Sequence, residues 1–168
     1  MILAVDVSYR EDRAVTAGAL LDVWDDCEPR QVLVTHISGV APYQPGQFYR
    51  RELPCILALL DELGRVPEQI VVDGYVYLGK KRRAGLGRHL YDALDGRAAV
   101  IGVAKSRFRA TPAAEILRGR SRRPLYVTAV GISEAEAGDL VASMCGEHRV
   151  PAILRLVDRL SKRREEGP

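Results

Sequence analysis

The stretch "ILAVDVSYREDRAVTAGALLDVW" (residues 2–24) contains two β-rich apolar runs separated by the polar turn "REDR". The first run covers residues 2–8 and the second covers residues 14–24, and a third run, "QVLVTHI", follows at 31–37. Successive strands joined by short polar turns are typical of an antiparallel meander. The N-terminal part of the chain is therefore predicted to form three antiparallel strands.

After residue 50 the pattern changes to an alternation of helices and strands. Apolar residues recur with a helical period from about 50 to Gly64, and "QIVVDGYVYL" (69–78) is predicted to be a buried strand. Further helices are expected at 86–95, 133–145 and 151–163, and further strands at 98–105 and 124–131. Three strands followed by such an alternation indicate an α/β fold with a mixed central sheet flanked by helices. In such sheets, ligands bind beyond the carboxyl ends of the strands.

The length and composition are those of one globular domain, which we expect to span residues 1–163, followed by a frayed tail at 164–168. Of the 168 residues, 47% are hydrophobic and 28% are charged. No 18-residue apolar run and no signal-peptide pattern is present. We therefore expect no membrane contact and a cytoplasmic location. The three cysteines lack CxxC spacing, which favours reduced, mostly buried thiols over a disulfide framework or a zinc site.

Basic residues are concentrated in two runs, although the net charge is only +3. One run comprises Lys80, Lys81, Arg82 and Arg83, and the other comprises Arg107, Arg109, Arg118, Arg120, Arg122 and Arg123. Such runs can neutralise the phosphates of a nucleic acid, and they are equally compatible with solvated loops.

Two aspartates interrupt apolar strands, Asp6 in "ILAVDVSY" and Asp73 in "IVVDGYVYL". A carboxylate in a hydrophobic strand is unfavourable unless a cation or a hydrogen-bond donor meets it. One such residue is commonly a cap for a turn, but two in one sheet favour a shared Mg²⁺ or Mn²⁺ ion. Glu52 could complete the site, as could Asp158, for which a salt bridge with Arg155 or Lys162 is the alternative. Gly74, next to Asp73, would allow a ligand to approach closely.

Several segments in order resemble the endonuclease V family of repair nucleases. "YQPGQFYRRELP" resembles the family's "YIPG…FRE" motif, and "VIGVAKSRF" is close to "IGVAKKRL". "AVDVSY", "VVDG", "GLGRHLYDAL", "PLYVTAVG" and "HRVPAILRLVDRL" match further segments of the family. Tyr43 to Glu52 is 9 residues and Glu52 to Asp73 is 21, which resembles the family's spacing.

The resemblance implies an RNase H-like fold and a metal-dependent endonuclease. By position, the family's acidic metal ligands correspond to Asp6, Glu52, Asp73 and Asp158. Lys105 corresponds to a lysine near the scissile phosphate. The wedge that separates strands beside an altered base corresponds to Tyr43, Gln44, Pro45 and Gly46. The implied reaction cuts at the second phosphodiester bond on the 3′ side of a hypoxanthine nucleotide, leaving 3′-hydroxyl and 5′-phosphate ends. Nucleic acid is the only partner implied, and a monomer is expected.

The departures from the family lie in segments that recognise the substrate. The family's "VDGHG" is "VDGYV" here, with Tyr75 and Val76 in place of histidine and glycine. "YLGKKRRAG" replaces an "HPR" segment, Gly131–Ser133 replaces "GHR", and the arginine-rich connection 106–123 is short. Two alternatives therefore stand beside inosine-directed cleavage: a nuclease with another nucleic-acid substrate, and a catalytically silent nucleic-acid-binding module.

Overall fold

The computed structural model describes residues 1–163, which form a mixed α/β fold around a seven-stranded central sheet. The strands lie in the order β3-β2-β1-β4-β7-β9-β8. Their bounds are β1 Ile2–Arg10, β2 Arg13–Leu21, β3 Gln31–Ser38, β4 Gln69–Asp73, β7 Ala99–Ala104, β8 Ala114–Ile116 and β9 Leu125–Val130. A small separate hairpin pairs β5 (Tyr77–Leu78) with β6 (Arg83–Ala84). The tail expected at 164–168 lies outside the described residues.

The first three strands form the predicted antiparallel meander, and β4 and β7 then add in parallel to β1. The ladder pairs Ile2 with Gln69 and Ala4 with Val71. Continued by two residues, the same register brings Asp6 opposite Asp73. Neighbouring strands lie roughly 5 Å apart, so this register alone brings the two strand aspartates together.

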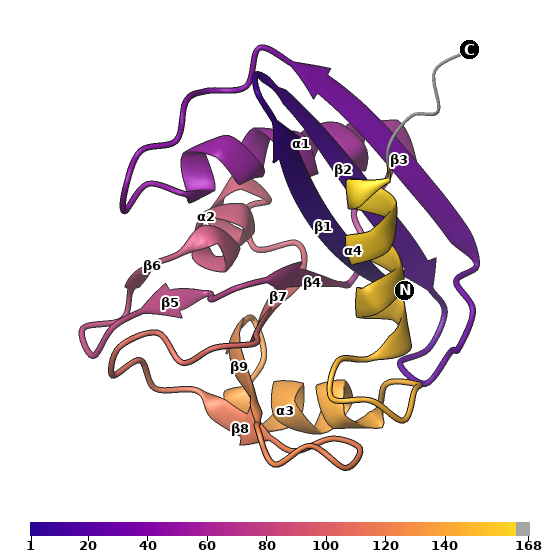
Figure 1. Cartoon of the computed structure of the whole chain (residues 1–168), viewed down its shortest axis with the longest axis vertical. Helices are drawn as coiled ribbons and strands as arrows, with labels where there is room; N and C mark the ends of the chain where they lie inside the picture. Colours follow the sequence, from indigo (N-terminus) through magenta and orange to yellow (C-terminus); the bar gives the residue numbers. More distant parts are fainter. Residues whose placement is uncertain (164–168) are drawn as a thin grey trace.

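Four helices cover the two faces of the sheet, and each face has its own hydrophobic core (Figure 1). Helices α1 (Tyr49–Leu63) and α2 (Leu86–Ala93) pack on one face, and α3 (Glu134–Ser143) and α4 (Ala152–Lys162) pack on the other. Strand side chains alternate between the faces, so Leu3 and Val5 contact the α1 core while Ala4 faces α4. Asp6 follows in this alternation and faces α4. Among the helices of residues 1–163, none is long and apolar enough to cross a membrane.

The expected strand at 69–78 is interrupted, which corrects the prediction from sequence. Strand β4 ends at Asp73, because Gly74 adopts a φ of 97°, a conformation that side-chain-bearing residues rarely take. The chain turns there, and Tyr77–Leu78 pairs with Arg83–Ala84 instead of extending the central sheet. The basic run at 80–83 is consequently presented on an exposed hairpin.

The expectation of three reduced cysteines is also wrong, since Cys27 and Cys145 form a disulfide with Cα atoms 5.1 Å apart. The bond joins the β2–β3 connection to the end of α3, positions separated by 118 residues in sequence. Only Cys55, on α1, is a free and buried thiol within residues 1–163. Spacing along the chain gave no signal for this pair, because the fold alone brings the two loops together.

Candidate active site

The fold brings three of the predicted acidic residues and Lys105 to one small cavity. Asp6, Asp73, Lys105 and Asp158 line it, from β1, the end of β4, the end of β7 and α4. An adjoining cavity is lined by Asp6, Asp73 and Glu52 of α1. The site thus lies beyond the carboxyl ends of the parallel strands, where α/β sheets bind ligands.

Helix α4 holds two of these carboxylates, one through the Lys162 pair already considered for Asp158 and one through a serine that the sequence interpretation missed. Ser161, fully buried, donates its hydroxyl to Asp6 Oδ2 at 2.6 Å. Lys162 Nζ forms an ion pair with Asp158 Oδ1 at 2.5 Å, and its hydrogen bond to Asp158 raises the pKa of Lys162. Lys162 lies at i+4 from Asp158, as the salt-bridge alternative required, and Ser161 lies at i+3, so helical spacing could have identified it as a further neighbour.

Burial and mutual repulsion raise the pKa of the acidic residues. Burial, followed by repulsion from Asp73 and Asp6, raises the pKa of Glu52 to about 9. Burial is also the main cause that raises the pKa of Asp6, partly offset by the Ser161 hydrogen bond. Asp73 stays reachable by solvent, yet burial of its carboxylate raises its pKa against the opposing effect of Lys105. The cluster is therefore short of positive charge.

We tested whether these residues fit the divalent cation that the sequence predicts. Within residues 1–163, no three Asp, Glu, His or Cys side chains are grouped closely enough to hold a metal ion as they stand. Asp6 and Asp158 are instead held by Ser161 and Lys162. The donor chemistry nevertheless fits Mg²⁺ or Mn²⁺, because the available groups are carboxylate oxygens. A cation would also relieve the repulsion that raises the pKa of Glu52 and Asp6.

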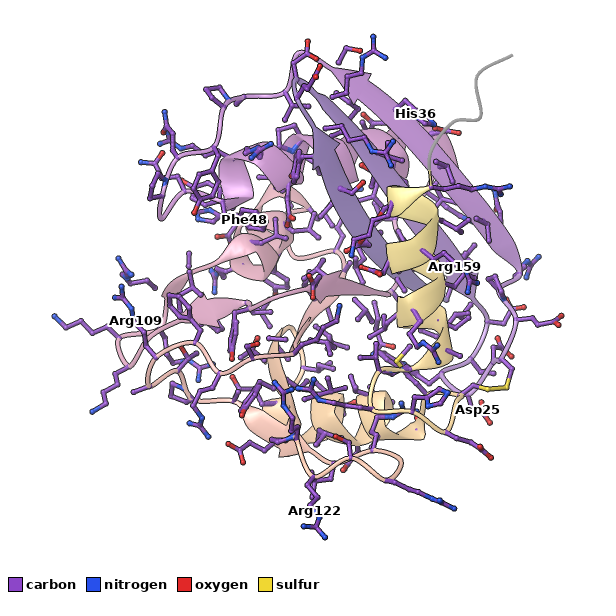
Figure 2. The ribbon with its side chains drawn as sticks, in the orientation of Figure 1. Asp25, His36, Phe48, Arg109, Arg122 and Arg159 are labelled. Carbon is purple, nitrogen blue, oxygen red and sulfur yellow. A yellow bond between two sulfur atoms is a disulfide. The ribbon has the colours of Figure 1, made fainter. Side chains whose placement is uncertain are left out.

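Beside the acidic cavities lies a larger pocket of about 650 Å³ that reaches Asp73. Its lining includes six aromatic side chains: Tyr43, Phe48, Tyr49, Tyr75, His89 and Phe108. The rings of Tyr49 and His89 stack with centroids 3.7 Å apart. Figure 2 labels Phe48, which precedes α1, and Arg109, which follows β7, on the same side of the molecule.

The predicted wedge residues are only partly at this pocket. Tyr43, with 59% of its surface exposed, lines it together with Gly46 and Gly74. Gln44 and Pro45 are exposed and lie outside the lining. A turn closed by the Gln47 N–H and the Gln44 carbonyl, 3.1 Å apart, presents Tyr43 to the pocket.

Tyr75 and Val76, the two departures from the family motif beside Asp73, lie in different environments. Val76 is fully buried in the α1 core and does not line the pocket, so its bulk does not narrow it. Tyr75 does line the pocket, but its hydroxyl donates to the Ser106 carbonyl at 2.8 Å and accepts from the Phe108 N–H at 3.0 Å. Tyr75 therefore fixes the loop that carries Phe108.

The two basic runs contribute Arg83 and Arg109 to this pocket, and their other members lie outside its lining. Lys80, Lys81, Arg82 and Arg83 are exposed on the β5–β6 hairpin, and Arg83 lines the pocket. Arg82 pairs with Glu134 at 2.7 Å, and Arg107 pairs with Glu115. Arg118, from the second run, is buried and donates to the carbonyls of Met144, Gly146 and His148, so it supports the fold.

Comparison with known proteins gives a consistent result. The endonuclease V family model matches residues 1–126. Endonuclease V of Azotobacter vinelandii is 33% identical across 98% of this chain and 83% of its own length. The catalytic domain of human endonuclease V superposes with a TM-score of 0.79 at 25% identity, covering 96% of this chain and 80% of that one.

Endonuclease V of Ciona intestinalis shares the fold, with a TM-score of 0.80 at 19% identity, covering 96% of this chain and 83% of that one. These neighbours identify the central sheet and its helices as the RNase H-like fold expected from the sequence. Together with the match over residues 1–126, they show that this chain belongs to the endonuclease V family of nucleases.

Proposed function

We propose that this protein is a divalent-metal-dependent endonuclease that cleaves a phosphodiester bond near a deaminated base, hypoxanthine, in DNA or RNA. The observation that carries the proposal is the Asp6–Asp73 register, with Glu52, Asp158 and Lys105 around it, beside an aromatic pocket. Residues 1–163 would act as one domain and as a monomer. The products would carry 3′-hydroxyl and 5′-phosphate ends, from a cut at the second bond on the 3′ side of the altered nucleotide.

In this proposal, Asp6, Glu52, Asp73 and Asp158 would hold Mg²⁺ or Mn²⁺. When bound, such an ion lowers the pKa of a water and neutralises charge that develops on the phosphate. Lys105 faces the same cavity and would stabilise the negative charge of the transition state. Lys162 pairs with Asp158, and Ser161 fixes the orientation of the Asp6 carboxylate.

The aromatic pocket would receive a base that has left the stack. Removing a base from a duplex costs a few kcal/mol, and stacking against aromatic side chains offsets part of that cost. The Ciona intestinalis protein has been solved with a DNA that contains an inosine, so this fold can hold such a strand. Here the extruded base would stack between two aromatic pairs, Tyr49 with His89 and Tyr75 with Phe108.

Cleavage of matched oligonucleotides tests the proposal. With Mg²⁺ or Mn²⁺, we expect strands containing one inosine to be cut at least about ten times faster than otherwise identical strands with adenosine, in DNA or RNA. Equal cleavage of both strands would reject the preference for inosine but keep the nuclease. Absence of cleavage of every strand, in either metal, would reject the nuclease and favour a silent binding module.

One observation favours a nuclease with a broader substrate range as a second candidate. Tyr75 stands where the family has histidine, and its hydroxyl is already occupied by Ser106 and Phe108. It therefore presents its ring to the pocket, and ring faces stack on any base. When duplexes with a mismatched base are added to the assay above, this candidate predicts cleavage at mismatched as well as inosine-containing positions.

We expect Tyr43→Ala to impair cleavage of duplexes much more than cleavage of single strands. An exposed tyrosine on a short turn can fill the gap left by an extruded base, and the lost stacking would reduce duplex cleavage by roughly 10- to 100-fold. Rates on paired and unpaired inosine-containing DNA measure the effect. Gln44→Ala, on the same turn but outside the pocket, is the matched control. An equal loss on both substrates would contradict a wedge role.

A further inference from the structure

A second hollow, of about 300 Å³, lies where the β1–β2 hairpin meets the end of α4. Arg10, Arg13 and Arg163 line it, with His36 and Ser38 of β3. All three arginines are exposed. In Figure 2 His36 marks this region, on the opposite side of α4 from Phe48 and Arg109 of the aromatic pocket. The hollow is thus separate from both the acidic site and the aromatic pocket.

The hollow is connected to the acidic site by an alternating row of β1 residues. Asp6, Ser8 and Arg10 lie on the same face of the strand, and each bonds to the end of α4. Asp6 accepts from the Ser161 hydroxyl, Ser8 donates to the Ser161 carbonyl, and Arg10 Nη2 donates to the Lys162 carbonyl at 2.6 Å. Arg10 therefore stands at a fixed offset from Asp6. Four residues of strand span about 13 Å.

The three arginines of the hollow are not paired with acidic side chains of the described residues. Across residues 1–163, no carboxylate forms an ion pair with Arg10, Arg13 or Arg163. Glu11 and Asp12 occupy the turn between the two strands and do not reach these guanidinium groups within ion-pair distance. Three exposed guanidinium groups around one hollow, with no ion pair to a carboxylate of residues 1–163, suit an oxyanion, above all a phosphate, which a guanidinium binds by two parallel hydrogen bonds.

We propose that Arg10, Arg13 and Arg163 form a subsite for a backbone phosphate of the nucleic acid, remote from the bond that is cut. The inference rests on the proposed function, because it assumes that a nucleic-acid strand occupies the acidic site. A duplex strand advances about 3.4 Å per nucleotide along its axis and also winds around it, so a straight distance of about 13 Å corresponds to roughly two to four nucleotides from the scissile phosphate. The subsite binds the strand without reading its sequence.

The test compares the double variant Arg13→Glu/Arg163→Glu with the wild-type protein. Arg10 is left unchanged, because its bond to the Lys162 carbonyl also helps to dock α4. On substrates with ten or more nucleotides on each side of the cut, KM should rise about tenfold or more while kcat stays unchanged. The slope of log affinity against log salt should become shallower by about one or more. Arg65→Glu, exposed before β4 at the opposite end of the parallel strands, is the matched control.

Length dependence separates this phosphate subsite from a general effect of charge. When either end of the substrate is shortened in steps, the difference between wild type and the double variant should vanish on one side, at roughly two to four nucleotides from the cut. An equal KM for both proteins on long substrates rejects the subsite and leaves the proposed function standing. A difference that persists on the shortest substrates also rejects it. Failure of the wild-type protein to bind any nucleic acid rejects the proposed function, and the subsite with it.

Discussion

Replacing Asp73 with alanine is expected to abolish cleavage while leaving the fold intact. Asp73 ends β4, shares both acidic cavities with Asp6, lines the aromatic pocket, and belongs to neither hydrophobic core. It is the one position of the predicted site that all three spaces share. Loss of a ligand that supports several kcal/mol of transition-state stabilisation would lower kcat by at least about a thousandfold.

The measurement is single-turnover cleavage of an inosine-containing strand, together with thermal unfolding and titration of Mn²⁺ binding. The melting temperature of Asp73→Ala in chelator should equal or exceed that of the wild type, since removing a desolvated carboxylate relieves repulsion. Asp139→Ala, which removes an exposed carboxylate on α3, serves as the control. Cleavage by Asp73→Ala at the wild-type rate would show that the metal site lies elsewhere.

The sequence was sufficient to predict the sheet and the pair of strand aspartates, and the reason is physical. The register of β1 and β4 is specified because both faces are buried, and a shift by one residue would move Leu3 or Val72 out of the α1 core to the other face of the sheet. Once the strands pair in parallel, Asp6 and Asp73 must be neighbours. Glu52 followed from the motif and its spacing, although nothing in the sequence showed how deeply it is buried.

What the sequence did not predict depends on contacts between segments that are distant along the chain. The Cys27–Cys145 disulfide joins two loops that carry no mutual signal. The break after Asp73 required knowing that Gly74 adopts a positive φ. The hydrogen bonds of the Tyr75 hydroxyl to Ser106 and Phe108 depend on the path of the loop after β7. Such features arise only after the sheet is assembled.

Glu52→Gln is expected to stabilise the metal-free protein at pH 8 and to leave its stability nearly unchanged at pH 4. Glu52 is 6% exposed, and burial with the repulsion of Asp73 and Asp6 raises its pKa from 4.5 to about 9. Between these values the unfolded chain loses the proton while the folded chain keeps it. Stability therefore falls as pH rises through this window, and the loss is complete above the folded pKa. Glutamine does not titrate, so the variant escapes this loss.

The expected gain at pH 8 is about 1 kcal/mol or more, which for a chain of this size raises the melting temperature by roughly 2–4 °C per kcal/mol. Unfolding in chelator at pH 4 and pH 8 measures it, with Asp61→Asn, an exposed carboxylate on the same helix, as the control. Adding Mn²⁺ should stabilise the wild type more than Glu52→Gln, because a ligand that binds the folded state raises its stability. The same substitution would then stabilise the metal-free protein and reduce the stabilisation that Mn²⁺ gives. This combination distinguishes a metal ligand from a buried structural acid. An equal melting-temperature difference at both pH values would show that Glu52 is not destabilised by its charge. An equal response of both proteins to Mn²⁺ would show that Glu52 is not a metal ligand.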